Sequence, residues 1–183
     1  MVPDLTGMIP GGDALPPVPL VDPTSINLST VLYDIEAIRL GNPQRFEMEQ
    51  LTAIVHVNYR DALIIGYKDV GADEFWTRGH LPGDPLLPGV LICEAAAQLC
   101  SFYCCLPGLV TDSVLGFGGL EEVRFRKSVR PGDRLVLVGK GERLRGRQKI
   151  FATQAFVGPD MVFHARILGV PLPGRATDPT SSN

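Results

Sequence analysis

The sequence predicts an α+β fold in which an antiparallel sheet wraps around one long central helix. One observation is the segment between Pro88 and Pro107, which is rich in helix-forming residues and apolar on nearly every side, as a buried helix must be. The other is a series of β-rich segments separated by short turns. These segments are 51–60, 62–70, 122–129, 134–143, 148–157 and 161–170. A chain of 183 residues, 45% of them apolar, can bury both layers in one domain.

The first 27 residues differ in composition from the rest of the chain. They contain six prolines and three glycines but no lysine or arginine, which predicts an extended or disordered arm. A secretory signal needs a basic start, and the first basic residue is Arg39, so we expect a cytoplasmic protein. The segment from Asn27 to Arg39 predicts a short helix that begins at a cap formed by Ser29 or Asn27. Ile35 and Ile38 would share its apolar face.

Residues 28–173 are predicted to form the domain, and residues 174–183 a polar tail. Within the domain, segment 114–120 is apolar and rich in glycine, which predicts a flexible stretch. It is not a dinucleotide-binding fingerprint, because a strand follows it where that motif requires a helix. His56 and His164 fall inside predicted strands and are interpreted as structural residues. The longest apolar runs are about ten residues, too short for a membrane span.

The predicted helix carries one acidic residue, Glu94. Gln98 and Ser101 follow it at offsets of four and seven, so the three polar side chains lie on one stripe of the helix. A carboxyl group that is buried without a partner avoids the loss of its hydration by keeping its proton. Glu94 is therefore a candidate proton donor at neutral pH.

A single histidine, His80, precedes this helix in a loop where Pro82, Pro85 and Pro88 recur at every third position. Proline at this spacing favours a stiff, extended backbone, which would hold the imidazole in place. The first backbone N–H groups of the helix have no partner within it, so they can bind an oxygen that becomes negative. A base, an acid and these donors suit the removal of a proton next to a carbonyl group. The alternative is a surface histidine and a paired core glutamate.

The same segment resembles a known family. Residues 80–98 read HLPGDPLLPGVLICEAAAQ, which is similar to the active-site signature of the FabZ-type 3-hydroxyacyl-acyl-carrier-protein dehydratases, without insertion. The resemblance implies the hotdog fold and a reversible dehydration of 3-hydroxyacyl thioesters to trans-2-enoyl thioesters. It implies that His80 is the base and Glu94 the acid, with no metal and no organic cofactor.

The remaining predicted site residues surround this pair. We expect the N–H groups of Gly89 and Val90 to bind the thioester carbonyl, and Gln98 to hold Glu94 or a water molecule in place. Leu87 and Phe117 are candidates for the lining of the acyl tunnel. In the family, the histidine and the glutamate of one site come from two subunits. The resemblance therefore implies an obligate homodimer and allows a trimer of dimers.

Positive charge is concentrated in one part of the sequence. Ten of the 17 basic residues lie between positions 124 and 149, against two acidic residues, although the chain has a net charge of −3. Such a segment favours a negatively charged partner, unless it simply forms solvated strand faces. Arg124, Arg126 and Lys127 resemble a basic segment of the family, which implies docking of the acidic acyl carrier protein. No motif accompanies the charge that would indicate nucleic acid.

All four cysteines lie on the predicted helix, at Cys93, Cys100, Cys104 and Cys105. Cysteines on one helix do not reach disulfide geometry easily, so we interpret them as small apolar core residues in a reducing compartment. A metal site would need histidine ligands nearby, and only His80 is close in sequence.

Two positions depart from the resembled pattern, and three alternative functions stay open. Where the family has a Pro-His-Arg-x-Pro-Phe segment, this chain has Gln44 for the histidine and Glu47 for the second proline. The alternatives are a FabA-type dehydratase/isomerase, a hotdog thioesterase and a non-catalytic module that binds acyl carrier protein. FabA-type enzymes carry aspartate at the position of Glu94, which argues against isomerisation.

Overall fold

The structure is a computed structural model that describes residues 15–109 and 115–172. Its helical elements are η1 (Pro23–Ser25), α1 (Ile35–Gly41), η2 (Phe46–Met48) and α2 (Gly89–Cys105). Its strands are β1 (Ala53–Asn58), β2 (Leu63–Asp69), β3 (Leu115–Phe125), β4 (Arg134–Arg143), β5 (Lys149–Val157) and β6 (Asp160–Pro171). The predicted polar tail, 174–183, lies outside the described residues.

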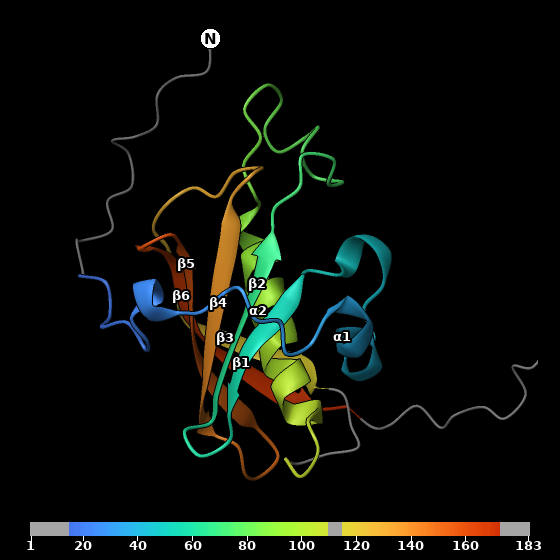
Figure 1. Ribbon diagram of the computed structural model, residues 1–183, viewed down its shortest axis with the longest axis vertical. Helices are drawn as coiled ribbons and strands as arrows, with labels where there is room; N and C mark the ends of the chain where they lie inside the picture. The colour runs from blue at the N-terminus through green and yellow to red at the C-terminus, as the bar shows by residue number, and fades with distance from the viewer. Residues whose placement is uncertain (1–14, 110–114, 173–183) are drawn as a thin grey trace, which may run out of the picture.

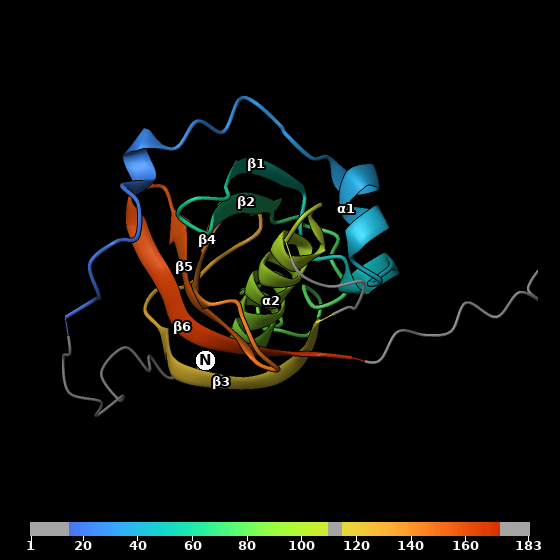
Figure 2. The same ribbon diagram turned by 90° about the horizontal axis from the view of Figure 1, so that it is seen from below.

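The six strands form one antiparallel sheet in the order β1-β2-β4-β5-β6-β3. The sheet curls around α2, which runs through the middle of the molecule (Figures 1 and 2). The predicted hotdog fold is therefore confirmed. Five of the six predicted strands agree with the structure to within two or three residues at each end, because their alternating patterns and turn residues are local signals.

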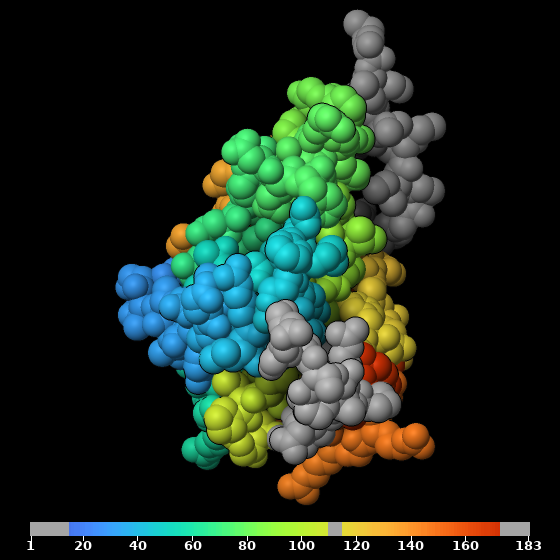
Figure 3. Space-filling model, turned by 90° about the vertical axis from the view of Figure 1, so that its right-hand side faces the viewer, coloured from blue at the N-terminus to red at the C-terminus, as the bar shows by residue number. Residues whose placement is uncertain are grey.

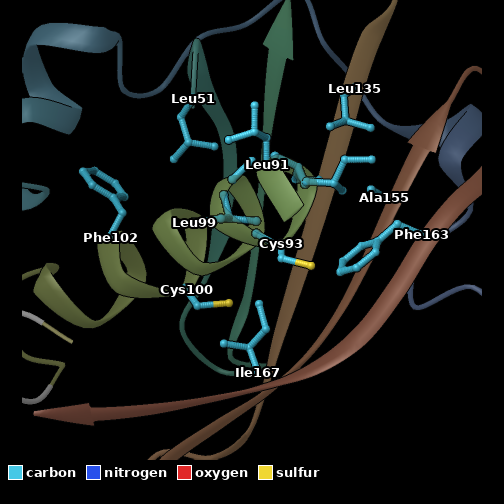
Figure 4. Packing of buried hydrophobic residues seen from close by; sticks show 14 of the residues in the cluster. Leu51, Leu91, Cys93, Leu99, Cys100, Phe102, Leu135, Ala155, Phe163 and Ile167 are labelled. Carbon is cyan, nitrogen blue, oxygen red and sulfur yellow. The ribbon is translucent and has the colours of Figure 1, made fainter. Parts of the chain in front are cut away.

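Helix α2 is buried because its surface is apolar on nearly every side. Ala95 and Leu99 are fully buried between the strands, and the other apolar side chains of the helix fill the concave face of the sheet (Figure 4). The helix approaches β2 closely at Gly66, where an added Cβ would lie 2.7 Å from the carbonyl oxygen of Ala53 and 3.0 Å from Leu99. The absence of a side chain at Gly66 therefore allows helix and sheet to pack at this distance. In the described part of the chain, no helix is long and apolar enough to cross a membrane.

The four cysteines are free thiols, as the sequence predicts. Cys93 and Cys100 point into the core between α2 and the sheet (Figure 4). Burial raises the pKa of the Cys93 thiol to about 11 and that of Cys104 to about 12, because the thiolate would lose its hydration. These thiols thus remain protonated and behave as small apolar groups.

The N-terminal arm, as far as the structure describes it (residues 15–27), is extended apart from η1 and packs on the sheet. Residues 15–32 cross the outer face of the sheet (Figure 2). Leu20 and Ile26 are among the side chains packed on a second apolar cluster there. The Gln154 side chain accepts a hydrogen bond from Leu20 N (2.8 Å) and donates one to Val18 O (3.0 Å). Apolar residues on the outward face of β1, β2, β4 and β5 need this cover, which the arm's composition does not reveal.

Helix α1 begins later than predicted, at Ile35. Asp34 is its N-cap, since the Asp34 carboxylate accepts a hydrogen bond from the backbone N–H of Ala37 at 3.0 Å. The Asn27 side chain instead accepts from the N–H of Ser29 in a local turn. Both segments carry capping signals, and the packing of α1 against α2 selects the second one.

Strand β3 begins earlier than predicted and includes residues 115–120, so the prediction of a flexible stretch there is wrong. It pairs with β6, and the register is irregular at two places, between Phe117 and Gly119 and between Glu121 and Arg124. An added Cβ at Gly118 would lie 3.0 Å from the carbonyl oxygen of Leu168, so this glycine permits a close approach of the two strands. Among the described residues, nothing pairs with the outer edge of β3, which exposes Phe117, Leu120 and Phe125.

The raised thiol pKa values predict a loss of stability at alkaline pH. In the unfolded chain these thiols ionise near their ordinary pKa of 9.0. In the folded chain the pKa is about 11 for Cys93 and about 12 for Cys104. Their contribution to the free energy of unfolding is therefore complete below pH 9 and falls as the pH rises toward 11 or 12. Urea unfolding across this pH range measures it. The Cys93→Ala, Cys104→Ala double variant should show a smaller decline, and an equal decline in both proteins would contradict the prediction.

Candidate active site

His80 lies in the loop between β2 and α2, where hydrogen bonds fix both its backbone and its ring. Its backbone N–H donates to Trp76 O, and its carbonyl accepts from Leu86 N, both at 2.8 Å. The ring Nδ1 lies 2.8 Å from the carbonyl oxygen of Leu86. Because a carbonyl oxygen only accepts, Nδ1 must carry the proton of a neutral imidazole, and Nε2 carries the lone pair. The side chain of His80 is exposed, so Nε2 is available to a substrate.

The His80 loop is attached to the segment that follows β3. Leu87 N donates to Val129 O at 2.8 Å, and Arg130 forms an ion pair with Asp84. The hydrogen bond from Arg130 lowers the pKa of the Asp84 carboxyl group. These contacts, together with the turn around Gly83, hold the loop, in addition to the prolines that the sequence shows. Trp76 is buried and donates through Nε1 to Glu74 at 2.9 Å.

Helix α2 begins directly after this loop. Pro88 is the N-cap, and the first N–H group bonded within this end of the helix is that of Leu91, which donates to Pro88 O at 2.9 Å. The N–H groups of Gly89 and Val90 precede it and have no hydrogen-bond acceptor among the described residues, as is usual at a helix N-terminus. The Phe125 ring packs on Gly89 so closely that an added Cβ would lie 2.8 Å from it. The glycine therefore leaves room for an aromatic ring beside these donors.

Glu94 lies on the second turn of α2 and is partly buried, which corrects the prediction of a fully buried acid. Its Oε1 accepts a hydrogen bond from Gln98 Nε2 at 2.8 Å and a longer one from Gln44 Nε2 at 3.4 Å. In the described residues, no donor contacts Oε2. The carboxyl group thus has one oxygen held by amides and one oxygen free.

Gln98 uses its whole side chain in this network. Nε2 also donates to Met48 O at 2.7 Å, and Oε1 accepts from the backbone N–H of Gln50 at 2.9 Å. Asn42 Nδ2 donates to the backbone carbonyl of Gln98 at 3.0 Å. The amide of Gln98 therefore fixes Glu94 and segment 42–50 together. Sequence reasoning missed the contributions of Asn42 and Gln50, and its only signals for this segment were the departures at Gln44 and Glu47.

Comparisons with known proteins place this site in a family. The model of the FabA-like domain matches residues 42–166, which include every residue of the site. This chain belongs to the FabA-like family.

Several proteins that are similar to this chain have names that state a function. The 3-hydroxyacyl-[acyl-carrier-protein] dehydratase FabZ of Syntrophobacter fumaroxidans is 37% identical over 138 residues, covering 74% of this chain and 91% of the relative. The bifunctional enzyme LpxC/FabZ of Chlorobaculum tepidum is 36% identical over 140 residues, which are 75% of this chain and 30% of that longer enzyme. A solved structure, the dehydratase heterocomplex ApeI:P from Xenorhabdus doucetiae, superposes with a TM-score of 0.64 at 17% identity and covers 75% of this chain and 91% of its own. The last likeness supports the fold alone.

Within one FabA-like domain, the two predicted catalytic side chains do not meet. His80 is bound to Leu86 and Glu94 to Gln44 and Gln98, and no hydrogen bond joins the two in the described part of the chain. The segment after α1 lies directly against the His80 loop on the surface (Figure 3). An open cleft of about 410 Å³ runs between them. It is lined by Phe46, Glu47, Glu49, Asp73 and Phe75, among others.

The two acyl-tunnel candidates of the FabA-like domain lie in different environments. Leu87 is 5% exposed and belongs to the core around α2. Phe117 is 47% exposed on the free edge strand β3. Their part in binding an acyl chain stays a prediction.

The basic residues of segment 124–149 form two groups instead of one surface. Strand β4 separates them, and its ten residues span roughly 30 Å. Arg124, Arg126 and Lys127 lie at the end near the His80 loop, where Lys127 pairs with Asp160 and Arg126 donates to His164. Arg143, Arg145 and Arg147 lie at the opposite end, on the β4–β5 hairpin. Among the described residues, no cluster of three or more potential metal ligands is present.

The Gln98 network predicts a large effect of removing one amide. Gln98→Leu keeps the side-chain volume but leaves the Gln50 N–H and the Glu94 carboxyl group without their partner, so the free energy of unfolding should fall by about 2 kcal/mol or more. Urea unfolding measures the change, and hydrogen exchange at Gln50 should become faster. Ser101→Ala is the matched control, because the buried Ser101 hydroxyl has no hydrogen-bond partner in the described structure. A similar loss in both variants would argue against the network.

Proposed function

We propose that this protein dehydrates 3-hydroxyacyl-acyl-carrier-protein thioesters to trans-2-enoyl thioesters in fatty acid or related lipid or polyketide biosynthesis. The observation that carries the proposal is the pair of oriented groups on the family's signature: an imidazole with Nε2 free and a carboxyl group with Oε2 free. We place the reaction in the cytoplasm, which the four free thiols support.

His80 is the general base of the proposed reaction. Its Nδ1–H donates to Leu86 O, so the neutral ring presents the Nε2 lone pair to the α-proton of the substrate. When Nε2 takes the proton, the Leu86 carbonyl stabilises the imidazolium through the same hydrogen bond. The hydrogen bonds of the loop hold the ring in place, which lowers the entropic cost of reaching the transition state.

The N-terminus of α2 stabilises the enolate that forms. As the α-proton leaves, negative charge develops on the thioester carbonyl oxygen, which the N–H groups of Gly89 and Val90 bind. Phe125 packs beside them and excludes water from one side of the helix end.

Glu94 is the general acid. Because Oε1 already accepts hydrogen bonds from Gln98 and Gln44, Oε2 is the oxygen that carries the proton when the carboxyl group acts as the acid. Oε2 donates this proton to the β-hydroxyl group as the C–O bond breaks, and water leaves. The α-proton remains on His80, and its return to Glu94 through solvent restores the starting state. The proton balance closes without a redox step.

The site is completed by a second copy of the chain. His80 and Glu94 are bound by separate neighbours within one chain, and His80 is exposed. The outer edge of β3 offers eleven residues with exposed Phe117, Leu120 and Phe125 and, among the described residues, no partner strand. An edge of this length and apolarity favours pairing with another copy. We infer a homodimer, with a trimer of dimers as a further assembly, in which each site takes its histidine from one subunit and its glutamate from the other.

Acyl carrier protein docks at the group of basic residues near the His80 loop. Arg124 and Lys127 are exposed there, at the same end of β4 as the proposed base. Acyl carrier protein is acidic, so charge complementarity orients its thioester arm toward the site.

Removal of either catalytic group should abolish the reaction. Enoyl absorbance with crotonyl thioester measures hydration, the reverse reaction, and we expect His80→Ala and Glu94→Gln each to lower kcat by about 10²-fold to 10⁴-fold. Thermal unfolding serves as the control that each variant still folds. Release of free thiol would instead indicate a thioesterase, and wild-type kcat in either variant would contradict the assigned role.

Mixing the two inactive variants tests the shared site. A dimer of one His80→Ala chain and one Glu94→Gln chain contains one intact site and one doubly defective site. Refolding or co-expressing the two chains should therefore restore up to about a quarter of wild-type activity, since half the dimers are mixed and each has one site. No recovery would show that each chain forms its own site.

Charge reversal tests the docking surface. We expect Arg124→Glu, Lys127→Glu to raise KM for crotonyl-acyl-carrier protein by about tenfold or more, while KM for crotonyl-pantetheine stays unchanged. Arg145→Glu, Arg147→Glu is the matched control at the opposite end of β4 and should leave both values near wild type. Equal effects of the two double variants would assign the interaction to net charge instead of this surface.

A further inference from the structure

A small cavity lies between α1, segment 42–51 and α2, and the apolar side chains of Ile35, Ile38 and Leu51 form part of its lining. Its polar wall consists of Arg39, Asn42, Gln44, Glu49 and Gln98. The space open to the centre of a water molecule is about 10 Å³, which is the size needed for a single water. The cavity does not include Glu94 itself, but two of its wall residues, Gln44 and Gln98, donate hydrogen bonds to Glu94.

Two buried oxygens of this wall have no hydrogen-bond partner within the described structure. They are Asn42 Oδ1 and Gln44 Oε1. Asn42 is 3% exposed, and its Nδ2 is already directed to the backbone carbonyl of Gln98. Buried amide oxygens are almost always satisfied by protein or by ordered water. Both oxygens therefore require a donor, and the cavity is the space that they share.

We propose that this cavity binds one water molecule, which donates to Asn42 Oδ1 and Gln44 Oε1. Arg39 lines the same cavity, and three of its five N–H groups are used by Glu36 and Glu49. Another N–H can donate to the water, which gives it three partners, the usual number for a buried water. A water molecule can donate two hydrogen bonds and accept one here, which matches the two amide oxygens and the Arg39 N–H group.

Through this water, Gln44 is a positioning residue for Glu94. The two ends of an amide have nearly the same shape, so packing alone does not decide which end faces the carboxyl group. A water that binds Oε1 in the cavity keeps Nε2 directed at Glu94 Oε1. The second amide donor then stays on Oε1, and the transferable proton stays on Oε2. The reversed amide would place an acceptor against Oε1 and favour the proton there, away from the substrate.

Gln50 provides an internal comparison. Its side-chain Oε1 is also buried without a partner, but Gln50 does not line the cavity and its Nε2 donates to Glu47 O. The proposal therefore concerns the pair Asn42 and Gln44 and not every buried amide of the segment.

A high-resolution crystal structure of the full chain tests the water site directly. We expect density for one water within hydrogen-bond distance of Asn42 Oδ1 and Gln44 Oε1 in the wild type, and its loss in Gln44→Leu. A cavity closed by a side chain, or density absent from the wild type, would overturn the proposal. This readout needs no activity, so it stands apart from the proposed dehydratase function, on which the positioning role rests.

A double-mutant cycle on crotonyl thioester hydration tests the positioning role. Gln44→Leu should lower kcat by about tenfold with little change in KM, since the substrate still binds but Glu94 loses its orientation. Asn42→Ala should have a smaller effect, and the double variant should be no worse than Gln44→Leu, because both remove the same water. Multiplicative effects would exclude a shared water.

Ser101→Ala is the matched control for the cycle, because it also removes a buried side-chain oxygen that has no hydrogen-bond partner in the described structure, but Ser101 lies on α2 and outside the cavity. Its effect should multiply with that of Gln44→Leu. If Asn42→Ala does not fold, the wild-type density and the kcat of Gln44→Leu still decide the question. A wild type without hydration activity but with the water in place would reject the dehydratase function alone.

Discussion

Burial of α2 inside the curled sheet is the constraint on which the rest of this structure depends. A helix that is apolar on nearly every side has no stable place at a surface, and six antiparallel strands provide the concave apolar face that it requires (Figure 2). Gly66 allows the close packing that excludes water from this contact. Both helix ends are thereby placed relative to the sheet, and with them the donors at Gly89 and the carboxyl group of Glu94.

The few polar groups that accompany this burial do the chemical work. Gln98 enters the core with every donor and acceptor of its amide used, so it stabilises the fold and orients Glu94 through the same atoms. His80 is oriented by a backbone carbonyl, which selects its tautomer. The hydrogen bond at His80 Nδ1 leaves Nε2 free, and the hydrogen bonds at Glu94 Oε1 leave Oε2 free among the described residues. Each of the two side chains is therefore oriented by contacts within its own chain.

Segment 42–50 is where this chain differs from the pattern it resembles, and it is also where the acid is controlled. Gln44 stands in the place of a histidine. Its side-chain amide is neutral, can bind in either of two orientations, and donates a hydrogen bond to Glu94. Asn42 and Gln44 share a cavity with the Arg39–Glu49 ion pair, so charge is kept behind the amides and away from the carboxyl group. Glu47, the other departure, lines the open cleft between segment 42–50 and the loop that precedes α2.

The central helix and most of the strands could be predicted from the sequence, and the same is true of the two residues proposed as the catalytic pair. These features depend on signals between near neighbours: an apolar helix bounded by Pro88 and Pro107, alternating strands with turn residues, and a signature of 19 consecutive residues. The tertiary structure alone decided the rest. The arm covers apolar residues on four distant strands, and α1 begins at Ile35 because it packs on α2 there. The tautomer of His80, the free oxygen of Glu94 and the separation of the basic residues to two ends of β4 depend on contacts between segments far apart in sequence. No local pattern encodes such contacts, because they arise only when the sheet closes around the helix.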